Sequence, residues 1–318
     1  MVALVGRRRY RLGAEIATSR SGKVHRGADC AAGTEVAIKV EPPGECSPRL
    51  PREAAVYMAL EGVRGVPRLH WSGSEGGVGV LVTERMGPTL ERVFRAHGRS
   101  LRRAQVVDTA LQVVNILELI HARGYVHRDV RPEKFLLGRG LCTDQVHLVG
   151  LSVAKRFRDA AGKRHIPYRE SSSKVATWNP VFASVNAHMG RESSRRDDLE
   201  SAGYMIAYLF RGDLPWQAAA PSGAGVHAGI LRSKLRASVE ELCEGCPPQL
   251  AEFISCCRGL RFEQRPDYAH LRSLLQGMGR RAHEGRRSDP LAYRFERDWT
   301  FRPVARRSDS MVQASAAH

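Results

Sequence analysis

Three charged residues stand in an order and at spacings that could position a phosphate group and catalyse its transfer. Asp129 follows a His-Arg pair and is the candidate base for a substrate hydroxyl. Lys39 ends a short apolar run, and its ammonium could contact the α- and β-phosphates of a nucleotide. Glu53 lies on the helix expected next and could hold Lys39 by an ion pair. This set suits phosphoryl transfer, because that reaction needs positioning and charge neutralisation more than covalent help.

The loop from His127 to Lys134, HRDVRPEK, resembles the catalytic loop of protein kinases. That loop ends in an asparagine whose oxygen holds a magnesium ion, but this chain has the cation Lys134 there. A second metal ligand is expected in an Asp-Phe-Gly tripeptide, where this chain has Gly150-Leu151-Ser152. Arg131 replaces a catalytic lysine and keeps its charge but not its shape. We therefore predict that magnesium is not held in the ordinary way and that the site has no metal ligand.

An adenine nucleotide would be bound by residues from several separated segments. The phosphate-cradling loop should read Gly-x-Gly-x-x-Gly, but it reads ATSRSG and keeps only Gly22. Because glycines let the backbone approach the phosphates, we expect weaker ATP binding, with ATP still a candidate cofactor. The ammonium of Lys134 could pair with nucleotide phosphate in place of a metal. The predicted nucleotide contacts are Ile16, Ser19, Gly22, Val24, Ala37, Lys39, Glu84, Met86, Lys134 and Leu136.

The elements that must position these residues follow from hydrophobic spacing. Residues 36–40 and 79–83 are β-rich runs that predict strands, and residues 51–60 between them have helical spacing. Apolar residues recur at helical spacing over 106–120 and predict a long helix. Residues 198–210 are apolar on most faces, as in a helix that passes through a core. A small β-rich part therefore precedes a larger helical part.

Motifs in the second half of the chain carry a more specific resemblance. They are HIPYRE at 165–170, ASVN at 183–186, SRRDDLES at 194–201, LPWQ at 214–217 and LRF at 260–262. With them the chain resembles the casein kinase 1 family, over about residues 10–299. The resemblance implies descent from an enzyme that used ATP and magnesium to phosphorylate serine or threonine near acidic or pre-phosphorylated residues. Val181 stands where the family has an arginine that receives such groups, which puts that anion pocket in doubt.

The resemblance implies an α+β, bilobal protein-kinase fold with a small β-rich N-lobe and a larger helical C-lobe. We predict a basic N-terminal arm at residues 1–9, the N-lobe at 10–86, the C-lobe at 87–299 and a flexible tail at 300–318.

The composition limits which partners and which cellular compartment are expected. The chain has 318 residues with 50 Lys and Arg against 33 Asp and Glu, a net charge of +17, which favours acidic or phosphorylated protein partners. The arginines are scattered and no nucleic-acid module is recognisable. No apolar run reaches the roughly 20 residues that a membrane span needs. Seven cysteines argue against a disulfide framework, so we expect an intracellular protein, cytoplasmic or nuclear.

Three functions stay open. Joint replacement of both metal ligands favours a casein kinase 1-like pseudokinase, impaired or inactive in catalysis, that acts as a scaffold and can bind nucleotide. The retained catalytic residues, Asp129, Lys39, Glu53 and Arg131, keep an active serine/threonine kinase with atypical metal use as the alternative. A basic binding module with a non-functional cleft is the second alternative.

Overall fold

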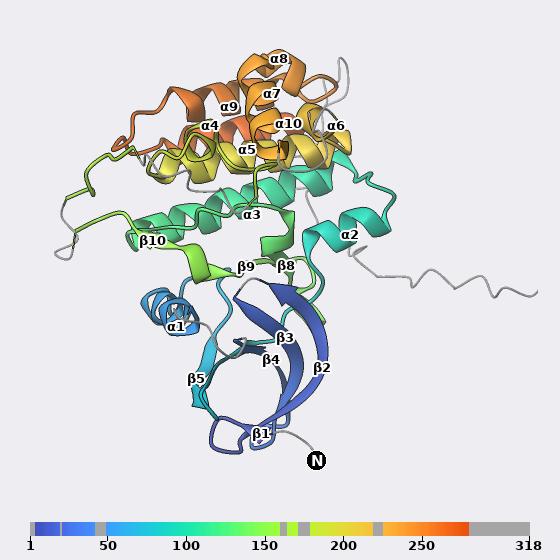
Figure 1. Ribbon diagram of the computed structural model, residues 1–318. Coiled ribbons are helices and arrows are strands. Elements are labelled where there is room, and N and C mark those ends of the chain that lie inside the picture. Colours follow the sequence, from blue (N-terminus) through green and yellow to red (C-terminus); the bar gives the residue numbers. More distant parts are fainter. Residues whose placement is uncertain are drawn as a thin grey trace, which may run out of the picture. The chain divides into compact units, whose positions relative to one another are not determined.

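The computed structural model describes residues 4–19, 21–41, 49–159, 164–170, 179–218 and 225–279. All of these belong to one compact unit, residues 1–284, and Figure 1 shows its sheet followed by its helices along the chain. In the described part of the chain, no helix combines the length and the apolar character that crossing a membrane requires. The tail predicted at 300–318 and the last part of the predicted C-lobe, 280–299, lie outside the described residues.

The N-terminal region is a six-stranded antiparallel sheet in the order β1-β2-β3-β4-β6-β5. Alternation along its strands gives the sheet a buried face, where Val36, Ile38, Val80 and Val82 pack with Tyr10. The opposite side of β4 carries the residues of the predicted site, because side chains alternate between faces. The strands are β1 (Leu4–Val5), β2 (Tyr10–Ser19), β3 (Gly22–Asp29), β4 (Thr34–Val40), β5 (Leu69–Glu75) and β6 (Val78–Glu84).

Helix α1 (Leu50–Ala59) follows β4 and has Pro51, a residue suited to a first helical turn, directly after its first residue. It packs against β5, β6 and the short 3-10 helix η3 (Leu151–Val153). The buried Tyr57 and Leu151 lie at this junction. Helix α1 is therefore the element that touches both the sheet and the segment after Gly150.

The C-terminal region is built around α5, which is buried on nearly every side and packs against α3 and α9. The part of α5 after its charged first turns is apolar on most faces, as such a central place requires, and Figure 1 shows its neighbours on both sides. The helices are α2 (Leu90–Ala96), α3 (Arg103–Ala122), α4 (Val185–His188), α5 (Arg195–Arg211), α6 (Pro215–Ala218), α7 (Val226–Arg236), α8 (Val239–Leu242), α9 (Pro248–Gly259) and α10 (Tyr268–Gly279).

Two small antiparallel pairs frame the catalytic loop. Strand β8 pairs with β9, and β7 pairs with β10, so that the loop lies between the ends of β7 and β8. The short 3-10 helix η1 (Pro132–Lys134) ends the loop directly before β8. The strands are β7 (Tyr125–Val126), β8 (Phe135–Leu137), β9 (Val146–Leu148) and β10 (Lys155–Arg156), and η2 (Gly140–Cys142) joins β8 to β9.

The predicted α+β, two-lobed architecture is confirmed by this sheet-rich N-terminal region and helical C-terminal region. The predicted strands and helices at 36–40, 79–83, 51–60 and 106–120 fall inside or within one residue of observed elements, and α5 extends the helix predicted at 198–210 by a turn at its start. The lobe boundaries at residues 86 and 299 stay predictions.

Candidate functional site

The ion pair expected between Lys39 and Glu53 is present. The Lys39 Nζ atom lies 2.6 Å from Glu53 Oε2, and the two side chains are 11% and 2% exposed. Lys39 is fixed on β4 between Val24 of β3 and Leu81 of β6, while Glu53 belongs to the first turn of α1. The pair therefore ties α1 to the sheet in a place that is almost closed to water.

Asp198 of α5 holds the catalytic loop in place. Its carboxylate accepts hydrogen bonds from the backbone N–H groups of His127 (2.7 Å) and Arg128 (2.8 Å), and lies 2.9 Å from His121 Nε2. Burial opposes ionisation, but the hydrogen bonds and charges of His121 and the loop still lower the pKa of Asp198. These bonds stabilise the left-handed backbone of Arg128, with φ of 67°.

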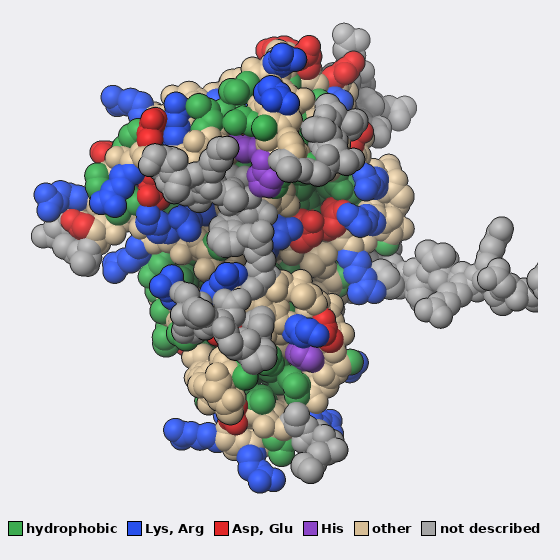
Figure 2. Space-filling view, viewed as in Figure 1, with side chains coloured by type: hydrophobic (Ala, Val, Ile, Leu, Met, Phe, Trp, Pro, Cys, Tyr) green, Lys and Arg blue, Asp and Glu red, His purple; other side chains and the backbone are tan. Residues whose placement is uncertain are grey.

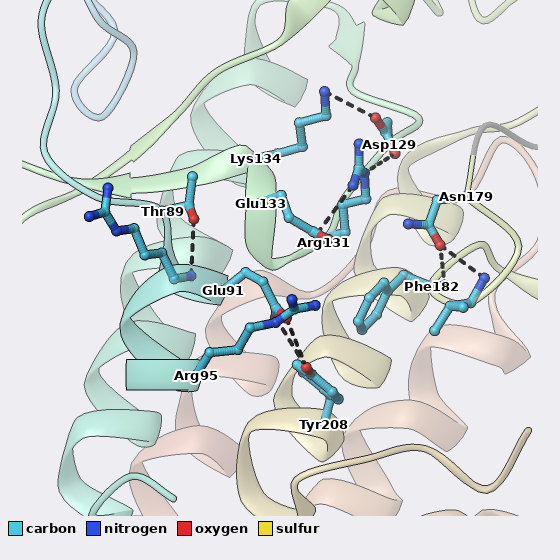
Figure 3. Close-up of polar contacts among 12 residues, drawn as sticks. Thr89, Glu91, Arg95, Asp129, Arg131, Glu133, Lys134, Asn179, Phe182 and Tyr208 are labelled. Atoms are coloured by element: carbon cyan, nitrogen blue, oxygen red, sulfur yellow. Dashed lines mark hydrogen bonds and ion pairs between the residues drawn. The ribbon is translucent and has the colours of Figure 1, made fainter. Parts of the chain in front are cut away.

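The carboxylate of Asp129 is held by two cations from its own loop. Arg131 Nε donates to Oδ1 over 2.8 Å, and Lys134 Nζ lies 3.3 Å from Oδ2 (Figure 3). Arg131 also reaches Glu133 Oε2 at 3.3 Å. Both oxygens that could accept a proton from a substrate hydroxyl are therefore already paired with positive charge.

Lys134 and Gly150 share one small volume. A Cβ atom added to Gly150 would lie 2.7 Å from Lys134 Nζ and 3.0 Å from its Cδ, closer than side chains approach one another. Gly150 also has φ of 77°, which favours glycine. The lysine side chain is 15% exposed, and burial lowers its pKa while the charge of Asp129 raises it. The ammonium thus occupies the space beside Gly150.

The residues in this place do not fit a divalent metal ion. Magnesium takes oxygen ligands, mainly carboxylates. Position 134 contributes an ammonium and position 150 contributes no side chain, while the carboxylate of Asp129 already faces two cations and that of Glu133 pairs with Arg131. Across the described ranges, no cluster of three or more His, Cys, Asp or Glu side chains is arranged to hold a metal.

The predicted nucleotide contacts divide between the two regions. Val24 and Ala37 are partly buried on β3 and β4, and Leu136 lies on β8, bridged to Thr89 before α2. Met86 is buried, whereas the Glu84 side chain is exposed. Ile16 of β2 is 48% exposed.

The turn between β2 and β3 is tightened by its own side chain. Ser19 Oγ donates to the Gly22 carbonyl over 2.8 Å and lies 3.4 Å from Ser21 Oγ. Gly22 has φ of 129°, and an added Cβ would meet the carbonyl oxygen of Val40 at 2.1 Å. A glycine is therefore required there for the hairpin to approach β4, whatever its role toward phosphate.

Several residues near the site were not predicted from the sequence. The Lys234 ammonium on α7 is 1% exposed and donates to the carbonyls of Pro180 (2.6 Å) and Ala183 (2.5 Å). The indole N–H of Trp216 donates to the Val181 carbonyl over 2.8 Å. A lone lysine on an amphipathic helix gives no signal of such a role, because its partners are backbone atoms.

A small pocket, open to solvent, lies beside Asp129. It is bounded by the catalytic loop, by residues 179–187 and by α5. Asn179 shapes its rim by accepting hydrogen bonds from the N–H groups of Val181 (3.0 Å) and Phe182 (3.4 Å), as Figure 3 shows. Residues 180–183, whose carbonyls accept hydrogen bonds from Lys234 and Trp216, therefore form one wall of this pocket.

Comparison with known families agrees with this geometry. A family model described as Protein kinase domain matches residues 10–274, which is most of the chain and includes every residue of the candidate site.

Proposed function

Because this chain belongs to the protein kinase family, we propose that it is a catalytically impaired or inactive member, a pseudokinase that acts through protein contacts and can bind nucleotide. The motifs at 165–170 and 194–201 further support a casein kinase 1-like origin. Its partners would be proteins, as for other domains of the family.

One observation carries this proposal: the Lys134 ammonium lies against both Asp129 and the space beside Gly150. In active kinases, metal ions in this region neutralise the charge that builds on the transferring phosphate. A single ammonium brings one positive charge and cannot bridge two phosphate oxygens as a metal does. Since each 1.4 kcal/mol lost from transition-state binding costs about tenfold in rate, phosphoryl transfer should be slower by orders of magnitude.

Nucleotide binding is less affected in this proposal. The Lys39–Glu53 pair is intact and closed to water, and Val24, Ala37 and Leu136 supply apolar surface for a base. The Lys134 ammonium could pair with a phosphate oxygen once it leaves Asp129. We therefore expect ATP to bind without magnesium.

A second candidate is a slow serine/threonine kinase with atypical metal use. It is favoured by Asp129, which the bonds of Asp198 to the loop hold in place, and by the intact Lys39–Glu53 pair. A third, the basic binding module, rests on the net charge of +17. Figure 2 gives it little support on the face it shows, because Lys and Arg side chains are spread over that face and not gathered in one patch.

A phosphorylation assay separates these candidates. Purified full chain is incubated with labelled ATP and casein, with magnesium or manganese, beside an Asp129→Asn control. We expect no transfer above the control. Metal-dependent transfer that the control lacks would overturn the pseudokinase proposal and support the slow kinase. A thermal shift with ATP tests the third candidate, because a binding module without a nucleotide site would not respond.

A further inference from the structure

Three arginines surround one carboxylate where the chain crosses from the sheet to the helical region. Glu35 of β4 forms ion pairs with Arg26 of β3 and with Arg139, which precedes η2. Strand β6 ends at Glu84, which pairs with Val36 of β4. The next residue, Arg85, therefore stands opposite Glu35, the residue before Val36. We call Arg26, Arg85 and Arg139 the hinge arginine cluster.

The cluster has more positive charge than Glu35 can balance. Three guanidiniums and one carboxylate leave a local net charge of +2. The side chains of Arg26 and Arg139 are 61% and 45% exposed, so the surplus charge faces solvent. An arrangement of this kind attracts anions and raises their local concentration.

Arg85 is the member with unmet hydrogen-bonding capacity. Its Nε and Nη1 atoms are buried and have no hydrogen-bond partner among the residues that the structure describes. Burial lowers the pKa of Arg85, and the charges of Arg139 and Arg26 act in the same direction against the attraction of Glu35. A buried donor without an acceptor destabilises a protein, so it needs an explanation, and a ligand that supplies the acceptor is one such explanation.

The chemistry of the missing partner follows from these donors. Guanidinium groups recognise carboxylates and phosphates through paired N–H donors, and Glu35 already shows two members of the cluster paired with a carboxylate. The cluster lies on the same face of the sheet as Ala37, one alternation away on β4, and Arg85 stands between Glu84 and Met86, two of the predicted nucleotide contacts. It therefore borders the predicted nucleotide site but shares no residue with the set proposed to bind nucleotide.

We propose that the hinge arginine cluster is a docking site for an acidic segment of a partner protein, with an aspartate or glutamate carboxylate bound by Arg85. The exposed Arg26 and Arg139 would pair with neighbouring carboxylates of the same segment. This site is independent of catalysis, so it can be tested without ATP and stands or falls apart from the proposed function.

Arg85→Met is the decisive variant, because methionine keeps the apolar stem and removes the guanidinium. The probe is a labelled peptide of aspartate and glutamate, measured by fluorescence anisotropy against the full chain at low salt. We expect binding to the natural chain that weakens as salt rises, and Arg85→Met to weaken it by about tenfold to a hundredfold. We also expect the thermal midpoint of the peptide-free variant to rise by about 2 °C or more, because a desolvated cation is removed.

Three comparisons complete the test. Arg103→Met removes an exposed arginine from the first turn of α3 and should leave both readouts unchanged. A peptide of asparagine and glutamine should not bind. Any of three results would overturn the docking proposal. The acidic peptide does not bind, Arg85→Met binds it as well as the natural chain does, or inorganic phosphate alone at the same concentration raises the thermal midpoint as the peptide does.

Discussion

The side chain of Lys134 fits its site because residue 150 has none: the distance from its Nζ atom to a Cβ built on Gly150 is 2.7 Å. The two departures from the expected metal ligands are therefore one structural unit. The ammonium fills the space, pairs with Asp129 Oδ2, and is shielded from water by the same packing.

Restoring one expected metal ligand without the other should therefore fail. Gly150→Asp alone must displace the end of the Lys134 side chain and also places a non-glycine residue at φ of 77°, so we expect it to lower the unfolding free energy by about 1–3 kcal/mol. Lys134→Asn removes the crowding but not the backbone strain at position 150, so the double variant should regain only the part of the loss that crowding causes. Urea unfolding of the four proteins gives the coupling, for which we expect about 1 kcal/mol or more. Additive effects would show that the two positions do not share the space.

The double variant also tests the functional proposal. It restores both expected oxygen ligands beside Asp129, so magnesium should now stabilise the protein in the presence of ATP, while neither single variant should respond. Casein phosphorylation by the double variant, absent from Asp129→Asn in the same background, is the stronger readout. If the natural chain already responds to magnesium as the double variant does, Lys134 does not replace the metal.

Nucleotide binding should be independent of metal in the natural chain. ATP at a thousand times its Kd should stabilise the fold by about 4 kcal/mol, which a thermal-shift titration detects readily. The shift should be the same with magnesium or with a chelator, and it should fall in Lys134→Met, which keeps the length of the side chain but not its charge. A shift that needs magnesium would contradict the prediction.

The Lys39–Glu53 pair gives a prediction about stability. Glu53→Gln leaves the Lys39 ammonium buried without its counter-charge, and breaking a buried pair in this way costs about 3 kcal/mol or more. The double change Lys39→Met with Glu53→Met removes both charges and should be much less harmful. Urea unfolding measures both. ATP-induced stabilisation should be lost in both proteins. Glu53→Gln leaves Lys39 without the partner that positions it, and the double change lacks the lysine itself.

Lys234 should make the protein more stable as the pH rises above neutrality. Burial lowers its pKa to about 7, so between that value and the ordinary value near 10.4 the unfolded chain binds a proton that the folded chain does not. The free energy of unfolding should therefore increase by up to about 1.4 kcal/mol per pH unit. The window is pH 7 to 8.5, because above it the buried thiols of Cys243 and Cys257, whose pKa values burial raises, oppose the trend.

The comparison protein for that measurement is Lys234→Met, which loses the ammonium over the rings of Tyr204 and Trp216 but keeps an unbranched apolar chain of similar length and has no proton to release. The difference in unfolding free energy between the two proteins should change with pH over this window. A constant difference would mean that Lys234 stays protonated in the folded protein.

Local patterns were enough to predict the elements and part of the site. Strand β4 and helix α3 follow from spacing, and the Lys39–Glu53 pair follows from motif order, because partners within recurring motifs keep their places in the fold. The two cations on Asp129 were not predicted. Their side chains could point toward nucleotide or toward Asp129, and sequence spacing does not decide between these rotamers.

The hinge arginine cluster and the Lys234 anchor could not be predicted for a different reason. Each depends on groups that are distant in the chain: Glu35 with Arg139, and Lys234 with backbone carbonyls near residue 180. Backbone acceptors carry no sequence signature, and an arginine among 50 basic residues is not distinguishable until the fold brings it to a carboxylate. Tertiary packing determines both.

The fit between Lys134 and Gly150 also has a consequence for the history of the chain. A mutation that returned aspartate to position 150 would have to displace the Lys134 side chain and would by itself restore only one of the two expected metal ligands. A return of asparagine at 134 would gain nothing while glycine remained at 150. Descendants of this sequence would thus inherit the changed site as a pair, and reversal would require two rare events in one lineage.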